Sequence, residues 1–229
     1  MVINREENMW KITYSDIRNN PEINTYIKKG DELLGMMGFT DHSEIHAAKV
    51  AETAATILQK LGYSERECEL AKISGYLHDI GNAVNRIDHA QTGAVMAFNI
   101  LSKLNMDPEE IATVVSAIGN HDESTGTAIS PVSAALILAD KTDVRRSRVR
   151  NKELVTFDIH DRVNYAVEKS KVIIDEKNKN IILELTIDMR ISSLIEYFEI
   201  FLTRMLMCRR AADFLNINFE LVANEKKMV

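Results

Sequence analysis

Five of the six histidines lie between residues 42 and 121, most of them at the end of an expected helix or on a helix face that should be buried. His46 shares an apolar stripe with Val50, because residues four apart lie on one face of a helix. His78 and Asp79 close the next apolar helix. A buried imidazole or carboxylate is costly unless it is paired, so these side chains need polar partners inside the fold.

Three more side chains of the same types follow. His89 begins the next apolar helix, His121 ends another, and Asp140 lies on the face of a third. A divalent cation is the partner that would satisfy imidazoles and carboxylates together. This ligand mixture favours Fe, Mn, Co, Ni or Zn over Ca, with Mg as a further candidate. Five or six protein ligands exceed what one tetrahedral site uses, which indicates two metal ions.

The remaining two histidines have simpler interpretations. A lone histidine on an apolar face is usually a hydrogen-bonded core residue, and only the ordered pattern reverses those odds. His42 lies four residues before His46 and could point the same way, which makes it a candidate substrate contact or extra ligand, although a helix cap at Asp41 would expose it. His160 and Asp161 lack an apolar frame and are interpreted as surface or capping residues.

Four segments carry a family resemblance. They are HAAKVA beginning at His46, LHDIG at 77–81, IGNHD at 118–122 and LILADKTD at 136–143. Over about residues 40–145 the chain resembles the HD superfamily of phosphohydrolases, whose signature is a first His, a His-Asp pair and a distant Asp. The resemblance implies four core metal ligands, namely His46, His78, Asp79 and Asp140.

Two-metal members of that superfamily add two histidines between the pair and the last Asp. His89 and His121 occupy such positions. The subfamily that splits diadenosine tetraphosphate symmetrically is similar in its HxxxGA segment, its later His and its LAD segment followed by arginines. One departure is Asn82, where many members have a Lys that could contact phosphate.

The resemblance also implies the catalytic roles. Metals would lower the pKa of a water molecule that attacks phosphorus. We expect Asp79 to bridge the metals and His78 to ligate beside it, both as catalytic residues. Lys141 is expected to act in catalysis, and Arg145 and Arg146 to contact substrate phosphate, because Lys and Arg are the usual phosphate partners. The alternative for these arginines is a solvated helix end, where cations suit the helix dipole.

The elements that must position these residues are mostly helices. Five helix starts carry residues that can cap a first turn. These are Asp41-x-x-Glu44, Ser64-x-x-Glu67, Asp88-x-x-Gln91, Asp107-Pro108-x-Glu110 and Ser130-Pro131. The sequence therefore predicts a mainly α fold, with a helical bundle over residues 1–150.

A different pattern follows Arg150. Residues 172–187 form two β-branched runs around a polar turn, which predicts a hairpin. Apolar residues then recur at helical spacing from Ile191 to Met205, and 218–223 is expected to return as a strand. We predict a small α+β C-terminal domain over residues 151–229, with an antiparallel sheet. The apolar cluster of Phe198, Phe201, Leu202 and Met205 is interpreted as core, and part of it is a candidate homodimer contact.

The composition of the chain limits the classes of molecule that it is expected to bind. The formal net charge is −6 and no block of basic residues occurs, so we expect no extended nucleic-acid surface. Two cysteines cannot build a disulfide framework and fit a reducing cytosol. No signal-peptide pattern or bilayer-length apolar run is present. We therefore expect a cytoplasmic protein with no membrane contact and a small phosphorylated substrate.

Three functions remain open at this point. The first is hydrolysis of a phosphate ester or anhydride in a nucleotide-like small molecule. The second is a cyclic-nucleotide or dinucleotide phosphodiesterase, which uses the same dinuclear arrangement. The third is a non-catalytic module that binds a nucleotide or a protein, and the intact set of expected ligands argues against it.

Overall fold

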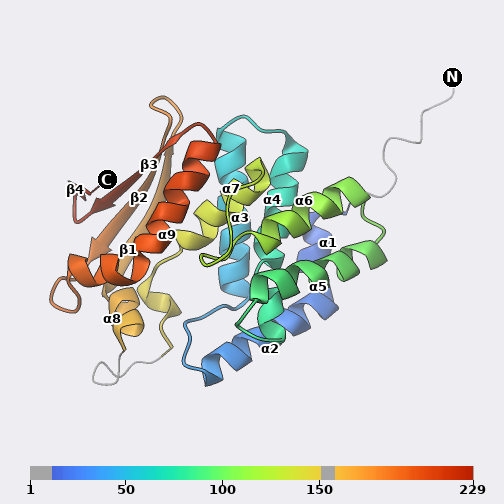
Figure 1. Ribbon diagram of the computed structural model, residues 1–229, viewed down its shortest axis with the longest axis horizontal. Coiled ribbons are helices and arrows are strands. Elements are labelled where there is room, and N and C mark those ends of the chain that lie inside the picture. Colours follow the sequence, from blue (N-terminus) through green and yellow to red (C-terminus); the bar gives the residue numbers. More distant parts are fainter. Residues whose placement is uncertain (1–11, 151–157, 229) are drawn as a thin grey trace.

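Helices account for nearly all of the regular structure up to residue 150. The computed structural model describes residues 12–150 and 158–228 (Figure 1). The helices are α1 (Tyr14–Arg18), α2 (Pro21–Met36), α3 (Glu44–Lys60), α4 (Glu65–Leu77), α5 (His89–Lys103), α6 (Pro108–Gly119) and α7 (Pro131–Lys141). Short 3-10 helices follow α4 and α7, namely η1 (Ile80–Ala83) and η2 (Arg146–Arg148). The expected mainly helical fold is confirmed.

Most of the expected helix starts are present. Ser64 forms the reciprocal capping box with Glu67, and the side chains of Asp107 and Ser130 cap α6 and α7. Two expectations were wrong. Ser43 caps α3 instead of Asp41, whose carboxylate accepts hydrogen bonds from Ser43. Asp88 precedes α5 in a left-handed conformation and makes no side-chain cap.

The close approach of α3 and α4 brings the first histidine next to the His-Asp pair. At the crossing, Gly75 of α4 packs against the backbone of Ala51 in α3. A Cβ atom added at Gly75 would lie 2.6 Å from the Cα of Ala51. Only glycine therefore allows this separation, because neither backbone atom can move without shifting a helix.

Replacing Gly75 by alanine should destabilise the protein. Overpacking of a core costs roughly 1–3 kcal/mol in unfolding free energy, which outweighs the better helix propensity of alanine. Urea unfolding followed by circular dichroism measures the change. Gly119→Ala is the matched control, since its new Cβ would meet only the Cβ of Ala94, at 3.7 Å. Equal stability of the two variants would contradict this packing account.

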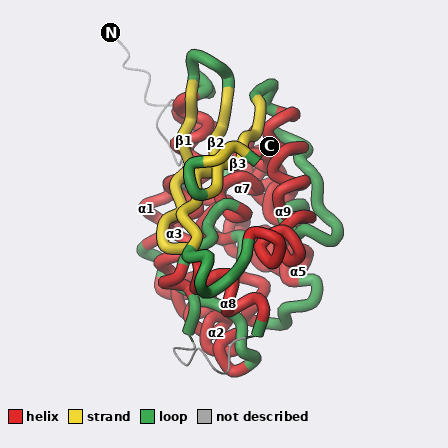
Figure 2. The backbone as a smooth tube through the Cα atoms, turned by 90° about the vertical axis from the view of Figure 1, so that its left-hand side faces the viewer, coloured by secondary structure: helices red, strands yellow, loops and turns green. Residues whose placement is uncertain are grey.

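The C-terminal part contains a four-stranded sheet. Its elements are α8 (Ile159–Ala166), β1 (Val167–Asp175), β2 (Asn180–Ile187), α9 (Leu194–Phe214), β3 (Asn218–Ala223) and β4 (Lys226–Lys227). The order is β1-β2-β3-β4, and the sheet lies in front of the helices in Figure 2. The β1–β2 hairpin is antiparallel as expected. The pairing of β2 with β3 is parallel and corrects the expected all-antiparallel sheet, because α9 returns the chain before β3 begins.

Helix α9 joins the sheet to the helical part, since it packs against both α7 and β3 (Figure 1). Its buried side includes Tyr197, Phe201 and Met205. Ile195 and Leu202, which belong to the stripe expected from the sequence, are exposed by 78% and 51%. Among the described residues, no helix has both the length and the apolar character needed to cross a membrane.

Candidate metal centre

All six expected metal ligands converge on one centre, although they come from five different parts of the chain. His46 lies in α3, His78 caps the end of α4 and Asp79 follows it. The other three are His89 at the start of α5, His121 after α6 and Asp140 in α7. The four histidines are buried, and the two aspartate side chains are exposed by only 11% and 12%.

One group of ligand atoms surrounds the Oδ2 side of Asp79. The potential ligand atoms of His46, His78 and Asp140 all lie within 4.8 Å of one another. His46 Nε2 is 3.4 Å from Asp140 Oδ1, and His78 Nε2 is 3.7 Å from the same atom. Asp79 Oδ2 lies 3.1 Å from His78 Nε2 and 3.8 Å from His46 Nε2. These atoms could hold one divalent cation.

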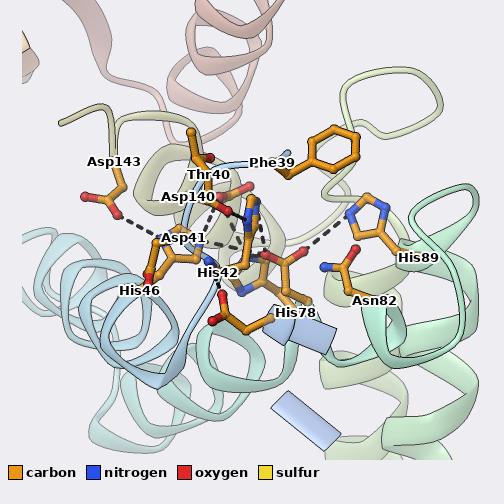
Figure 3. Close-up of polar contacts among 12 residues, drawn as sticks. Phe39, Thr40, Asp41, His42, His46, His78, Asn82, His89, Asp140 and Asp143 are labelled. Carbon is orange, nitrogen blue, oxygen red and sulfur yellow. Dashed lines mark hydrogen bonds and ion pairs between the residues drawn. The ribbon is translucent and has the colours of Figure 1, made fainter. Parts of the chain in front are cut away.

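A second group surrounds the other oxygen of the same carboxylate. Asp79 Oδ1 is 3.4 Å from His89 Nε2 and 3.8 Å from His121 Nε2. His46 and His89 lie on opposite sides of the centre in Figure 3. Asp79 therefore occupies the position of a bridging ligand between two candidate sites.

The second nitrogen of each imidazole is held by the protein. Nδ1 donates to a backbone carbonyl oxygen in four rings: His42 to Thr40 at 2.7 Å, His78 to Gly75 at 2.8 Å, His89 to Arg86 at 3.0 Å and His121 to Ile118 at 2.6 Å. A carbonyl oxygen only accepts, so Nδ1 carries the proton and Nε2 presents a lone pair to the centre. Metal-ligating histidines are typically oriented in this way.

The Nε2 atoms lack suitable partners without a cation. Among the described residues, His46 Nε2 and His78 Nε2 are buried and accept no hydrogen bond. His89 Nε2 and His121 Nε2 face each other at 3.2 Å, which brings two lone pairs together. Unsatisfied buried polar atoms are costly, and divalent cations would satisfy all four. The residues thus fit a two-metal centre, while their role as ligands stays a prediction.

Asp143 orients the remaining ring. Its Oδ2 accepts the Nδ1 proton of His46 at 2.8 Å (Figure 3), and its Oδ1 pairs with Lys49 at 2.6 Å. Burial favours its neutral form, yet His46, Arg148 and Lys49 hold the pKa of Asp143 well below its ordinary value. Asp143 is 2% exposed, and it is paired with arginines as well, since Arg145 and Arg148 lie 2.9 Å and 3.8 Å from its oxygens.

The charge states of four of the six expected ligands suit metal ligation. Burial opposes ionisation of Asp79 and Asp140, but His78 beside the first and Lys141 beside the second hold each pKa well below its ordinary value. Burial lowers the pKa of His121, and it lowers that of His89 to about 4. These two imidazoles are therefore neutral at pH 7, as ligands must be.

The expected cationic residues lie in different places. Lys141 is buried and its Nζ is 2.7 Å from Asp140 Oδ2, so it contacts a candidate ligand. Arg145 instead pairs with Asp143 at 2.9 Å. Arg146 donates to the backbone oxygen of Tyr165 at 2.5 Å. Neither arginine lines the cavity described next, because each is turned toward a partner outside it.

A cavity of about 730 Å³ opens beside the centre. His42 and His89 line it, together with Phe39, Ile87 and Asp122. Three arginines that the sequence did not single out also line it, namely Arg86, Arg148 and Arg204. They enter from an η1–α5 loop, from η2 and from α9, so only the tertiary fold brings them together.

Arg86 places a positive charge beside Asn82, the position at which many members of the HD superfamily have a Lys. Its NH1 atom donates to Asn82 Oδ1 at 3.3 Å and lies 3.7 Å from Asp79 Oδ1. One feature of the sequence could have indicated this residue: Arg86 is the only positively charged residue between Asn82 and His89.

Comparisons with known proteins identify the family of this chain. The HD domain model matches residues 44–163, more than half of the chain and past the expected boundary at residue 150. An uncharacterized protein of Methanocaldococcus jannaschii is 27% identical over 193 residues, which cover 74% of each chain. Ribonuclease Y of Latilactobacillus sakei is 30% identical over 112 residues, 49% of this chain but 20% of that enzyme.

A crystal structure of a "predicted HD superfamily hydrolase" from an uncultured Thermotogales bacterium shares 26% identity at a TM-score of 0.43. The match covers 54% of this chain and 67% of the chain in that crystal structure. HD domains bind divalent metals, and the His and Asp clusters found here could hold them. By the extent of its match to the family model, this chain belongs to the HD domain family.

Proposed function

We propose that this protein is a metal-dependent phosphohydrolase that cleaves a phosphate ester or anhydride of a nucleotide-like small molecule. The observation that carries the proposal is the position of Asp79. Its Oδ2 lies nearest to His78 and its Oδ1 nearest to His89, and the candidate substrate cavity adjoins them. Such a centre is suited to displacement at phosphorus.

The chain's own residues would each do part of this work. Divalent cations, when bound, would supply an acidified water and positive charge for phosphoryl oxygens. Asp79, His46, His78, Asp140, His89 and His121 would hold them. Asp143 and the backbone carbonyls fix the imidazole rings, so little reorganisation is needed when a substrate enters. Lys141 offsets the negative charge of Asp140, since its Nζ lies 2.7 Å from Asp140 Oδ2.

The cavity supports a small substrate with both anionic and apolar parts. A volume of about 730 Å³ falls in the range of small-ligand sites. Arg86 lies beside the centre, and its guanidinium carbon is 5.7 Å from the Phe39 ring centroid. Phe39 and Ile87 provide apolar surface at the wall. A phosphate could bind near Arg86 while a planar group, such as a nucleobase, contacts this wall.

Phosphodiester hydrolysis is the second candidate. The similarity to ribonuclease Y favours it, because that relative is named for cleaving RNA. The net charge of −6 disfavours a long nucleic acid, since extended backbones are bound by broad basic surfaces. A cyclic nucleotide or a dinucleotide fits the cavity better.

A metal-dependent substrate screen tests the proposal. We expect the protein supplemented with Mn, Co, Ni, Fe or Zn to hydrolyse at least one nucleotide or phosphoester, and EDTA to stop the reaction. Nucleoside mono-, di- and triphosphates, cyclic nucleotides, dinucleotides and p-nitrophenyl phosphate make up the panel. Cleavage confined to diesters would favour the second candidate. Stoichiometric metal without any turnover would contradict both and favour a binding module.

A further inference from the structure

Helix α9 carries a basic residue into the candidate active site from outside the family match. The HD domain match ends at residue 163, and α9 begins at Leu194. Figure 1 shows α9 beside α7, the helix that contains Asp140. From this helix Arg204 reaches the cavity, where it is one of the lining residues. The C-terminal part therefore contributes directly to the cavity.

The guanidinium of Arg204 is held in one orientation. Its Nε donates to Glu123 Oε1 at 2.8 Å, which fixes one edge. Its guanidinium carbon lies 4.5 Å from the centroid of the Phe201 ring, which supports its plane. Phe201 is itself buried, with 3% of its surface exposed. An arginine fixed by an edge and a face loses little conformational freedom when it binds a ligand.

The terminal nitrogens of this guanidinium are left for something else. Among residues 12–150 and 158–228, Arg204 makes its side-chain hydrogen bond and ion pair with Glu123 and its cation–ring contact with Phe201. A guanidinium has five N–H donors, and Glu123 uses the one on Nε. The side chain is 23% exposed, so the remaining donors can meet a molecule in the cavity.

A row of alternating charges connects Arg204 to the candidate metal centre. Glu123 Oε1, which accepts from Arg204, is 3.8 Å from Lys141 Nζ. Lys141 Nζ is in turn 2.7 Å from Asp140 Oδ2. Arg204 therefore stands on the Asp140 side of the centre, whereas Arg86 stands next to Asp79 Oδ1. Both arginines line the cavity, so an anion bound there could meet both of them.

We propose that Arg204 is a substrate-binding residue whose terminal N–H groups hydrogen-bond the non-bridging oxygens of the substrate's phosphoryl group. The inference rests on the proposed function in one respect, that the substrate carries phosphate. The fork geometry of arginine matches a phosphate and gives charge-assisted hydrogen bonds. The competing explanation is a purely structural ion pair, in which Arg204 serves only to bind Glu123 and hold α9 in place.

Calorimetric titration with inorganic phosphate separates the two explanations. The proteins are the Mn-loaded full chain and its Arg204→Gln, Glu123→Gln and Arg210→Gln variants, with metal content measured for each. We expect Arg204→Gln to weaken phosphate binding roughly 10- to 100-fold, the worth of a charge-assisted hydrogen bond. Arg210 is exposed on the same helix, so its variant should bind phosphate like the unmodified protein.

Glu123→Gln breaks the same ion pair but retains the arginine. It should reduce phosphate affinity by less than about threefold if Arg204 contacts phosphate, because a neutral amide can still accept from Nε. Equal weakening by Glu123→Gln and Arg204→Gln, unchanged binding in Arg204→Gln, or no phosphate binding by the unmodified protein would each overturn the inference.

Arg204→Lys covers the case in which Arg204→Gln fails to fold or to load metal. The lysine keeps the charge but lacks the planar fork, so we expect intermediate phosphate affinity. Affinity equal to that of arginine would count against the proposal. Measuring turnover distinguishes failure of the proposed function from failure of the inference about Arg204. Arg204-dependent phosphate binding without turnover on the substrate panel defeats only the proposed function, and turnover with Arg204-independent binding defeats only this inference.

Discussion

Asp79→Ala should yield a folded protein that has lost both its metals and its turnover. Asp79 Oδ2 lies 3.1 Å from His78 Nε2 and Asp79 Oδ1 lies 3.4 Å from His89 Nε2, so the two oxygens of this carboxylate face both sets of imidazoles. Metal binding at both sites therefore depends on it. Because metals supply several kcal/mol of charge stabilisation, we expect turnover to fall roughly 10³-fold or more.

Elemental analysis after metal-supplemented expression, together with the most active substrate of the panel, measures both losses. Asp213→Ala is the matched control, since Asp213 is an exposed carboxylate on α9. Circular dichroism shows whether each variant keeps its helices. Full metal content in Asp79→Ala would rule out a bridging role for this residue.

His89→Ala and His121→Ala should each remove one metal and leave the other. Both rings face Asp79 Oδ1, and His121 also lies next to His78, with ring centroids 5.0 Å apart. Without His89 and His121, the first group still has four ligands when Asp79 is counted with His46, His78 and Asp140, and four ligands are enough for one cation. If hydrolysis uses both cations, turnover should fall by orders of magnitude even though about one metal per chain remains.

His160→Ala is the control for metal content, because this side chain lines the cavity but is 65% exposed and pairs with Asp158, which is not an expected ligand. Metal analysis of the three variants decides the stoichiometry. Two metals retained in both His89→Ala and His121→Ala, or near-normal turnover with one metal, would favour a mononuclear enzyme.

The sequence predicted best what local patterns determine. Ser64 and Asp107 cap helices through residues two or three positions away, and such contacts are visible in sequence. His46 and His78 could be placed on buried faces because helical periodicity fixes the direction of each side chain. The helical fold and the hairpin were confirmed for the same reason.

Features that depend on the path of the chain could not be predicted. The parallel pairing of β2 and β3 follows from the course of α9 across the sheet. Arg204 meets Glu123 only because α9 packs on α7, and no spacing in the sequence connects the two residues. Arg145 and Arg146 were expected at the substrate because they follow Asp140. Instead, Arg145 donates to the buried carboxylate of Asp143, and Arg146 donates to the backbone oxygen of Tyr165. The assignment of the six ligands is still a prediction.

Anomalous X-ray scattering from crystals of the metal-loaded protein tests the central claim most directly. We expect two peaks, each about 2.0–2.2 Å from its ligand atoms and each bonded to a different oxygen of Asp79. One should contact His46, His78 and Asp140, and the other His89 and His121. A single peak with His89 more than about 5 Å away, or metal bound without Asp79, would contradict the two-metal account.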